Sequence, residues 1–108
     1  MKKYKILWTK HAALDLEEIV AFIAAENLLA ASSLFAKVKS RCSKLSVDPE
    51  RNRIVPDLKD LGVSNYREII LKPYRILHKI SDSTIYVIAL VDSRRTIEYF
   101  LFQRLIRD

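Results

Sequence analysis

Three consecutive segments rich in isoleucine, valine, leucine and tyrosine constrain the fold more than any other feature of this chain. They span Tyr66–Leu71, Tyr74–Ile80 and Thr84–Val91, and only Lys72-Pro73 and Ser81-Asp82-Ser83 separate them. Such short connections between β-rich segments predict an antiparallel meander. In the third segment both alternating sets are apolar, so we expect this strand to be buried on both faces and to lie inside the sheet. The two sets are Ile85, Val87, Ala89 and Val91, and Tyr86, Ile88 and Leu90.

Two amphipathic helices are predicted upstream of the meander. Residues Lys5 to Trp8 are typical of a short first strand, after which Thr9 offers a hydroxyl group as a helix N-cap. The apolar positions of the first helix form one stripe: Ala12, Leu16, Ile19, Val20 and Ile23. After a break at Glu26-Asn27, a second helix is expected from about Leu29 to Leu45, with the stripe Ala31, Leu34, Val38, Cys42 and Leu45. Adjacent amphipathic helices with a tight connection predict an antiparallel helical hairpin.

The remaining segments are less regular. Residues 46–65 contain Pro49, Pro56 and Gly62 together with aspartate and asparagine, so turns and loops are expected there. Thr96 can cap a final helix whose apolar positions are Ile97, Leu101 and Leu105. The predicted order is therefore β-α-α-β-β-β-α, an α+β fold in which a two-helix hairpin packs on a small, mostly antiparallel sheet. A length of 108 residues fits a single domain spanning residues 1–108.

Composition excludes several classes of function. Gly62 is the only glycine, which rules out a P-loop or a glycine-rich dinucleotide fingerprint. His11 and His78 are the only histidines and lack metal-ligand spacing, so neither a metal site nor a cofactor is expected. Cys42 is the only cysteine and belongs to an apolar helical stripe, which predicts a packed, protonated thiol. No apolar run approaches the roughly 20 residues that span a bilayer. The apolar run after the basic start is too short for a signal peptide, so we expect a cytoplasmic protein without membrane contact.

Positive charge is concentrated in particular parts of the chain, and the formal net charge is +6. The densest run of lysine and arginine occupies positions 37, 39, 41, 44, 51 and 53. Arginine also alternates with tyrosine and aliphatic residues in the predicted strands. Arginine binds phosphates and carboxylates through forked hydrogen bonds. The basic excess therefore favours nucleic acid or an acidic protein segment as a partner.

The order of these elements, with the residues that occupy them, resembles the RelE/ParE superfamily of bacterial toxins from type II toxin–antitoxin systems. The resemblance covers nearly the whole chain. It is carried by Trp8 with Ala12-Ala13, Asp15-Leu16-Glu17-Glu18-Ile19, Phe22-Ile23, Leu45 with Pro49, Arg53-Ile54-Val55-Pro56, Tyr66-Arg67-Glu68, Tyr74-Arg75-Ile76 and Val91 with Arg94-Arg95. It implies a growth-inhibiting, plasmid-stabilising toxin. A cognate antitoxin would lay a helix or extended segment over the two-helix face and the sheet edge, and operator DNA would be contacted only through that antitoxin.

The superfamily holds two activities that the shared fold cannot separate. The RelE-like branch cleaves mRNA on the ribosome, which requires a base, an acid and cations around the phosphate. The ParE-like branch inhibits DNA gyrase by binding it and needs no acid–base machinery. The partners that the resemblance implies are therefore an antitoxin and either DNA gyrase or the ribosome with its mRNA.

The resemblance places the catalytic cations of a nuclease at Arg67, Lys72, Arg75 and Arg95. The residues for proton transfer are incomplete, because Asp92 stands where many relatives carry histidine and Leu101 occupies the position closest to the C-terminal tyrosine. Tyr99 lies two residues earlier and would point elsewhere on a helix. We therefore favour a ParE-like toxin. The alternatives are a RelE-like nuclease and a detoxified relative that acts only as an antitoxin-binding, co-repressor partner.

Several further residues are candidates for a role at the site. Contacts with the target or the antitoxin are expected from Tyr74, Arg94 and Arg53. Glu68 is either a general base or the ion-pair partner of a neighbouring arginine. His78 alternates with apolar residues, so a packed histidine is expected rather than a catalytic one. Arg75 alternates with Lys79 and is expected on the more polar face of the sheet.

Overall fold

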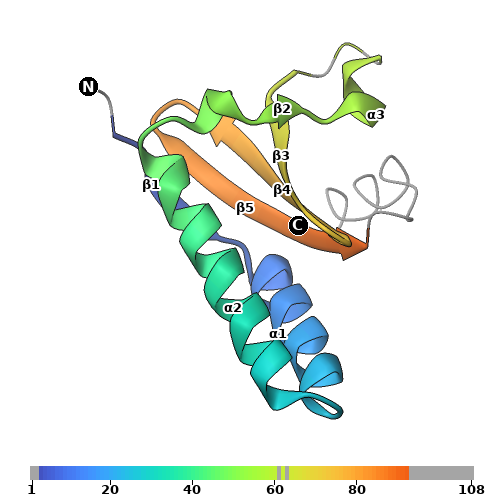
Figure 1. Cartoon of the computed structure of the whole chain (residues 1–108). Coiled ribbons are helices and arrows are strands. Elements are labelled where there is room, and N and C mark those ends of the chain that lie inside the picture. The colour runs from blue at the N-terminus through green and yellow to red at the C-terminus, as the bar shows by residue number, and fades with distance from the viewer. Residues whose placement is uncertain (1–2, 61, 63, 93–108) are drawn as a thin grey trace.

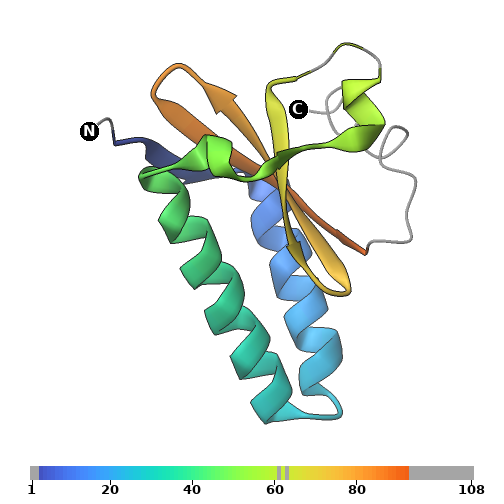
Figure 2. The same ribbon diagram turned by 45° about the horizontal axis from the view of Figure 1, so that its top comes forward.

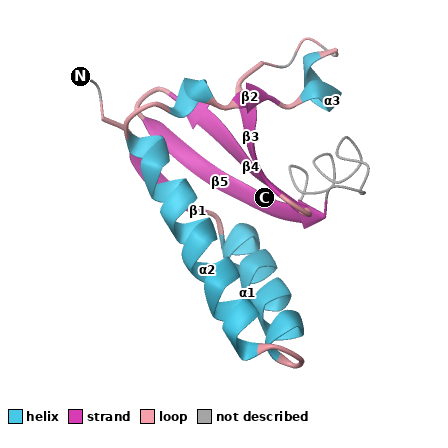
Figure 3. Cartoon of the chain, in the orientation of Figure 1, coloured by secondary structure: helices cyan, strands magenta, loops and turns pink. Residues whose placement is uncertain are grey.

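The computed structural model describes residues 3–60, 62 and 64–92 of the chain. The strands are β1 (Lys5–Trp8), β2 (Arg53–Ile54), β3 (Tyr66–Leu71), β4 (Tyr74–Ser81) and β5 (Thr84–Asp92). The helices are α1 (Lys10–Ala24), α2 (Leu28–Ser43) and α3 (Pro56–Lys59), and two short 3₁₀ turns, η1 (Lys44–Ser46) and η2 (Pro49–Arg51), follow α2. Figure 3 shows the helical hairpin and the sheet as separate layers of an α+β fold. The final helix expected from Thr96 lies outside the described residues.

The five strands form one sheet in the order β1-β5-β4-β3-β2 (Figure 1). Strands β2 to β5 pair antiparallel with their neighbours, whereas β1 pairs parallel with β5. The predicted meander is confirmed, and so is the interior position of its last strand. The expected order lacked β2 and α3. A strand of two residues and a helix of one turn are too short to leave a periodic pattern in a proline-containing stretch.

Helices α1 and α2 form the predicted antiparallel hairpin, and Figures 1 and 2 both show them side by side. The hydroxyl oxygen of Thr9 accepts a hydrogen bond of 3.1 Å from the backbone N–H of Ala12, which confirms the predicted cap. Asn27, expected only as a break, caps α2 by accepting a bond of 2.9 Å from the N–H of Ala30. Each cap satisfies a donor that a helix start would otherwise leave without a partner. Among the described residues, no helix combines the length and apolar character that crossing a bilayer requires.

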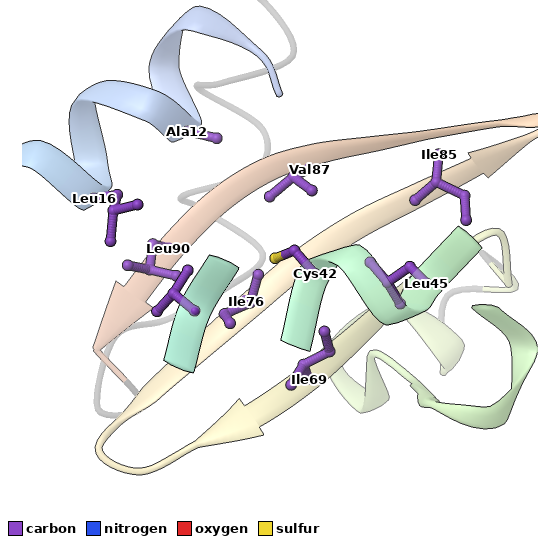
Figure 4. Packing of buried hydrophobic residues seen from close by; sticks show 10 residues of the cluster. Ala12, Leu16, Cys42, Leu45, Ile69, Ile76, Ile85, Val87 and Leu90 are labelled. Atoms are coloured by element: carbon purple, nitrogen blue, oxygen red, sulfur yellow. The ribbon is translucent and has the colours of Figure 1, made fainter. Parts of the chain in front are cut away.

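The main hydrophobic core lies between the hairpin and one face of the sheet (Figure 4). Its buried members are Ala12, Leu16, Val38, Cys42, Leu45, Ile69, Ile76, Ile85, Val87 and Leu90. The predicted helical stripes therefore face the sheet, as an apolar stripe on a surface helix should. Burial raises the pKa of the Cys42 thiol to about 12, and the positive charges of Lys39 and Arg41 offset only part of that shift. The prediction of a packed, protonated thiol is confirmed.

An extra residue in β5 changes which side chains face the helices. Leu77 of β4 pairs with Ala89, but the next residue of β4 pairs with Val87, so Ile88 forms a β-bulge. A bulge of one residue reverses the alternation of side chains along its strand. Leu90 consequently joins Val87 in the main core, whereas Ala89 joins Ile88 on the other face. The two alternating sets predicted for this strand are therefore wrong beyond the bulge.

A smaller apolar cluster occupies the opposite face of the sheet. Its members are Val55, Leu58, Tyr66, Leu77, Ile88, Ala89 and Val91. The two clusters lie on different faces because Ile76 and Leu77 are adjacent on β4 and must point in opposite directions. Val55 is the N-cap of α3 and Leu58 lies within it, so this short helix covers part of the second face. That cover is what allows charged residues to be buried nearby.

Candidate functional site

Four charged side chains, Arg53, Asp57, Glu68 and Arg75, form an ion cluster on the second face of the sheet. Glu68 is fully buried at its centre. Its Oε2 accepts a hydrogen bond of 2.5 Å from Nε of Arg53, and its Oε1 accepts one of 2.6 Å from Nε of Arg75. Nη2 of Arg75 also donates to Oδ1 of Asp57 at 2.8 Å. The sheet register creates this cluster, because Arg53 lies directly opposite Glu68 and Arg75 is its diagonal neighbour on β4.

Arg75 lies on the predicted face of the sheet, away from the main core, yet only 8% of the residue is exposed. Burial alone would lower the pKa of Arg75, but its hydrogen bonds to Asp57 and Glu68, and the negative charge of both carboxylates, raise the pKa above its ordinary value. The guanidinium is therefore permanently charged and directed toward the protein's own carboxylates. Of the two roles considered for Glu68, the structure confirms the ion-pair partner of an arginine.

A hollow of about 470 Å³ opens beside the ion cluster at the β3–β4 turn, where Lys72-Pro73 is a cis peptide bond. We call it the turn pocket, and its lining is Arg53, Ile70, Lys72, Pro73, Tyr74 and Arg75. The Arg53 side chain is 58% exposed, Lys72 is exposed and Tyr74 is half-buried. These three side chains can donate hydrogen bonds to a ligand that enters the turn pocket. Two cations and a phenol suit a carboxylate or a phosphate.

Arg67 lies on the other face of the sheet, because it precedes Glu68 on β3 and successive side chains alternate. Its Nη1 donates hydrogen bonds to the backbone carbonyls of Glu50, at 3.0 Å, and Asn52, at 2.8 Å. These bonds attach the segment between η2 and β2 to the sheet. The structure therefore separates Arg67 from Lys72 and Arg75, which it does bring together in the turn pocket. Arg94 and Arg95 lie outside the described residues.

His78 pairs with Arg67 across β3 and β4, and it is fully buried. Within the described residues, neither ring nitrogen makes a hydrogen bond of good geometry. Burial lowers the pKa of His78 from 6.5 to about 4; the positive charge of Arg67 contributes, and backbone groups of Pro49 and Ile76 offset part of the shift. The imidazole is neutral near pH 7 and inaccessible, so the prediction of a packed histidine is confirmed. No group of three or more histidine, cysteine, aspartate or glutamate residues that could hold a metal ion occurs in the described part of the chain.

A second candidate surface is an apolar groove of about 480 Å³ on the helical hairpin, which we call the helical groove. Its walls include Trp8 at the end of β1, Leu16 and Val20 of α1, and Phe35 and Lys39 of α2. The Lys39 ammonium lies 4.7 Å from the centroid of the Trp8 ring and 5.8 Å from that of Phe35. Such contacts hold a cation over aromatic faces. A neighbouring hollow shares Trp8 and Lys39 and continues the groove along β1, at the edge of the sheet.

Sequence reasoning did not identify Phe35 or Lys39 as site residues. Phe35 is 46% exposed although it is a large aromatic residue, and it follows Leu34 of the core stripe by one position. Lys39 comes four residues after Phe35, so both project from one side of α2. The sequence signal that could have identified this surface is Phe35, a large apolar residue that lies outside the core stripe of α2. The role of Trp8 as their partner depends on β1 lying beside the hairpin.

Comparison with known proteins identifies the family. The family model described as the ParE toxin of type II toxin-antitoxin system, parDE, matches residues 6–97. The chain belongs to the ParE toxin family. The chromosomal ParDE toxin–antitoxin system from P. aeruginosa contains a chain that superimposes on this ParE-family chain with a TM-score of 0.69 and 16% sequence identity, covering 83% of this chain and 96% of the other.

A second solved structure has the same fold as this ParE-family chain. It is the RelBE2 toxin–antitoxin complex from Mycobacterium tuberculosis, with a TM-score of 0.59, 19% identity, and coverage of 83% of this chain and 98% of the other. Sequence identities this low establish a common fold and no more. No protein with a curated description matches the chain. The α+β fold and the superfamily inferred from the sequence are confirmed.

Proposed function

We propose that this chain is the toxin of a type II toxin–antitoxin module, that it arrests growth in the cytoplasm by inhibiting DNA gyrase, and that a cognate antitoxin neutralises it. The match to the ParE toxin family over residues 6–97 carries this proposal. Inhibition by binding needs a shaped, charged surface and no group that transfers protons. The turn pocket provides such a surface, and Arg53 and Tyr74 in its lining are the proposed contacts with the target. Arg94, outside the described residues, is proposed as a further contact on the resemblance alone.

The geometry of the described cations supports binding over cleavage. Ribonucleolytic cleavage requires cations around one phosphate together with a base and an acid. Arg67 and Arg75 lie on opposite faces of the sheet, and both guanidinium groups donate to the protein's own oxygens. Glu68 is buried between two arginines and His78 is fully buried, so neither reaches a substrate.

Induction of the toxin gene, followed by a gyrase supercoiling assay with the purified protein, tests the proposal. Growth should stop on induction and resume when the product of the adjacent antitoxin gene is co-expressed, and supercoiling should be inhibited. Arg53→Ala combined with Tyr74→Phe should weaken inhibition. Exposed Lys59→Ala, on α3, is the matched control. Harmless overexpression would instead indicate a detoxified relative that acts only as an antitoxin-binding, co-repressor partner.

A ribosome-dependent ribonuclease is the second candidate function, and the turn pocket, whose lining includes Lys72 and Tyr74, is the observation that favours it. By the resemblance, this alternative assigns the catalytic cations to Arg67, Lys72, Arg75 and Arg95, and it would require a rearrangement that brings Arg67 to the face of the sheet that carries Arg75. It predicts unaffected supercoiling beside cleaved, ribosome-bound mRNA. It also predicts that Arg95→Ala abolishes toxicity while antitoxin binding survives.

We propose that the antitoxin binds the helical groove with an amphipathic segment. The groove combines apolar walls at Leu16, Val20 and Phe35 with a positive charge held by Trp8, which suits a helix carrying both apolar and acidic side chains. Operator DNA would then be contacted only through the antitoxin. Phe35→Ala should weaken the complex with the adjacent gene product. Phe22→Ala removes an even more exposed phenylalanine at the tip of the hairpin and should leave affinity unchanged.

A further inference from the structure

The far half of the helical hairpin is almost without charge. Residues 19–36 comprise the end of α1, the connecting turn and the first half of α2, and Glu26 is their only charged residue. At the chain's average of 30% charged residues, a run of this length would carry about five. A helix that faces water on one side normally carries charged residues there, whereas a helix that is apolar all round is buried against another element. The missing charges therefore indicate a contact on the outer side of this half.

The three most exposed large apolar residues of the described part of the chain lie at the same end of the hairpin. Phe22 is 82% exposed, Leu28 70% and Leu29 83%, and every residue from 25 to 30 is exposed. We call the surface formed by Phe22, Ala25, Leu28 and Leu29 the hairpin tip. Figures 1 and 2 both show the turn between α1 and α2 beyond the strands, so the sheet leaves the hairpin tip free for a partner.

The hairpin tip is large enough for an interface between proteins. A large apolar side chain that leaves water removes on the order of 150 Å² of accessible surface. On that basis Phe22, Leu28 and Leu29 together expose about 350 Å², which lies in the range of roughly 300–600 Å² at which an apolar patch on a monomer often has a function. A specific interface buries about 500 Å² or more on each partner. Ala25 and Ala30, both exposed, flank these residues in the sequence and can supply the remainder.

The charge of the hairpin tip selects among possible partners. Nucleic acids and anionic lipid surfaces are bound by lysine and arginine, but the one charge here is the carboxylate of Glu26. A second copy of the chain fits instead, because in a two-fold dimer the same apolar patch meets itself. Two antiparallel hairpins that overlap by about 16 Å bring Glu26 of each chain to the level of Lys37 in the other, where positive charge resumes along α2. Glu26 and Lys37 are both exposed, and neither forms a salt bridge with another described residue.

The hairpin tip is separate from the helical groove. Val20 lines the groove, and Phe22 follows it by two positions. Two positions place side chains about 200° apart around a helix, so Phe22 points away from the groove. An antitoxin in the groove and a second toxin at the hairpin tip can therefore be bound at the same time.

We propose that two copies of this chain associate through their hairpin tips. The two-fold arrangement buries Phe22, Leu28 and Leu29 of both chains and pairs Glu26 with the partner's Lys37. The association is a property of the free toxin and is independent of the target that the toxin inhibits.

Sedimentation velocity of the full-length, antitoxin-free toxin at about 5 and 200 µM measures the association, because an interface of this size gives a dissociation constant in the micromolar range. The wild type should change from monomer to dimer between these concentrations. Leu29→Glu should raise the dissociation constant about tenfold or more, since it places a carboxylate in an apolar contact. Val47→Glu makes the same change at an exposed aliphatic residue outside the hairpin and should associate as the wild type does. Circular dichroism verifies that both variants fold.

Two further measurements test the arrangement of the dimer. Ser33→Cys, near the middle of the overlap, should give a disulfide-linked dimer under mild oxidation, whereas Ser83→Cys, exposed in the turn between β4 and β5, should not. Glu26→Lys should weaken association a few-fold, and adding Lys37→Glu should restore it, because the pair is rebuilt with its charges exchanged.

A wild-type toxin that stays monomeric at the higher concentration would overturn the inference and leave the proposed function standing. Equal association of the Leu29→Glu and Val47→Glu variants, or a dimer crosslinked through Ser83→Cys in place of Ser33→Cys, would overturn it as well. The inference also fails if the toxin is monomeric and Leu29→Glu abolishes its binding to phosphatidylglycerol vesicles or to the product of the adjacent gene. The hairpin tip would then serve one of those partners.

Discussion

Nε of Arg75 lies 2.6 Å from Oε1 of Glu68, and both side chains are buried on the face of the sheet opposite the helical hairpin. Transferring either charge from water to the interior alone would be costly, so each depends on the other. Asp57 and Arg53 extend the pair at its two ends. The cluster holds β2, α3 and the start of β4 together, and it thereby shapes the turn pocket.

Replacing Glu68 with glutamine should destabilise the protein severely. The substitution preserves the shape of the side chain but leaves the Arg75 guanidinium buried beside a neutral group, and breaking a buried pair in this way costs about 3 kcal/mol or more. Urea denaturation monitored by fluorescence measures the change in the free energy of unfolding. Glu18→Gln, at an exposed position of α1, should change stability by less than about 0.5 kcal/mol. If Glu68→Gln lowers the free energy of unfolding no more than Glu18→Gln does, the ion cluster does not stabilise the fold as we describe.

Stability should fall as the pH is lowered from 6.5 to about 4, and His78 should account for part of the fall. The pKa of His78 is depressed by folding, so the unfolded chain binds a proton in this range while the folded chain does not. The stabilisation is complete above the ordinary pKa of 6.5 and is lost as the pH approaches 4, with a maximum effect of about 3 kcal/mol. His78→Leu removes the titrating group. Parallel stability–pH curves for the wild type and this variant would refute the assignment.

Cys42 should resist alkylation in the folded protein. Because its pKa is about 12, the thiolate that reacts with iodoacetamide is scarce near neutral pH, and the side chain is also buried. Mass spectrometry should show modification at least about a hundredfold slower in the native protein than in the urea-unfolded chain. Rapid labelling of the native protein would mean that α2 separates readily from the sheet.

Removing either helix cap should lower stability by about 1 kcal/mol. Thr9→Ala deprives the N–H of Ala12 of its acceptor, and Asn27→Ala does the same to the N–H of Ala30. Thermal unfolding followed by circular dichroism gives the change. Ser32→Ala, at an exposed interior position of α2, serves as the control and should leave stability equal or slightly higher, since alanine is the better helix former. A similar loss of stability in the Ser32→Ala variant would show that the effect of the cap substitutions does not come from the capping hydrogen bonds.

Local patterns were sufficient wherever one face of an element is buried. The bounds predicted for β3 are those observed, and the stripes around Leu16 and Val38 face the sheet as expected. These patterns are reliable because side-chain direction within an element depends only on its own periodicity. The turn residues Lys72-Pro73 likewise separate β3 from β4 as predicted.

Contacts between distant segments decided the rest. Nothing local distinguishes buried Arg75 from an exposed strand arginine; its burial depends on Asp57, 18 residues away, and on the cover that α3 provides. The bulge at Ile88 is likewise invisible in a strand apolar on both sides, because reversing the alternation there exchanges one apolar residue for another. By itself, then, the sequence determined the two long helices, the meander and the family to which the chain belongs. Which cations are paired internally and which face a partner was decided by the tertiary structure, because a charge's partner depends on which strands lie side by side.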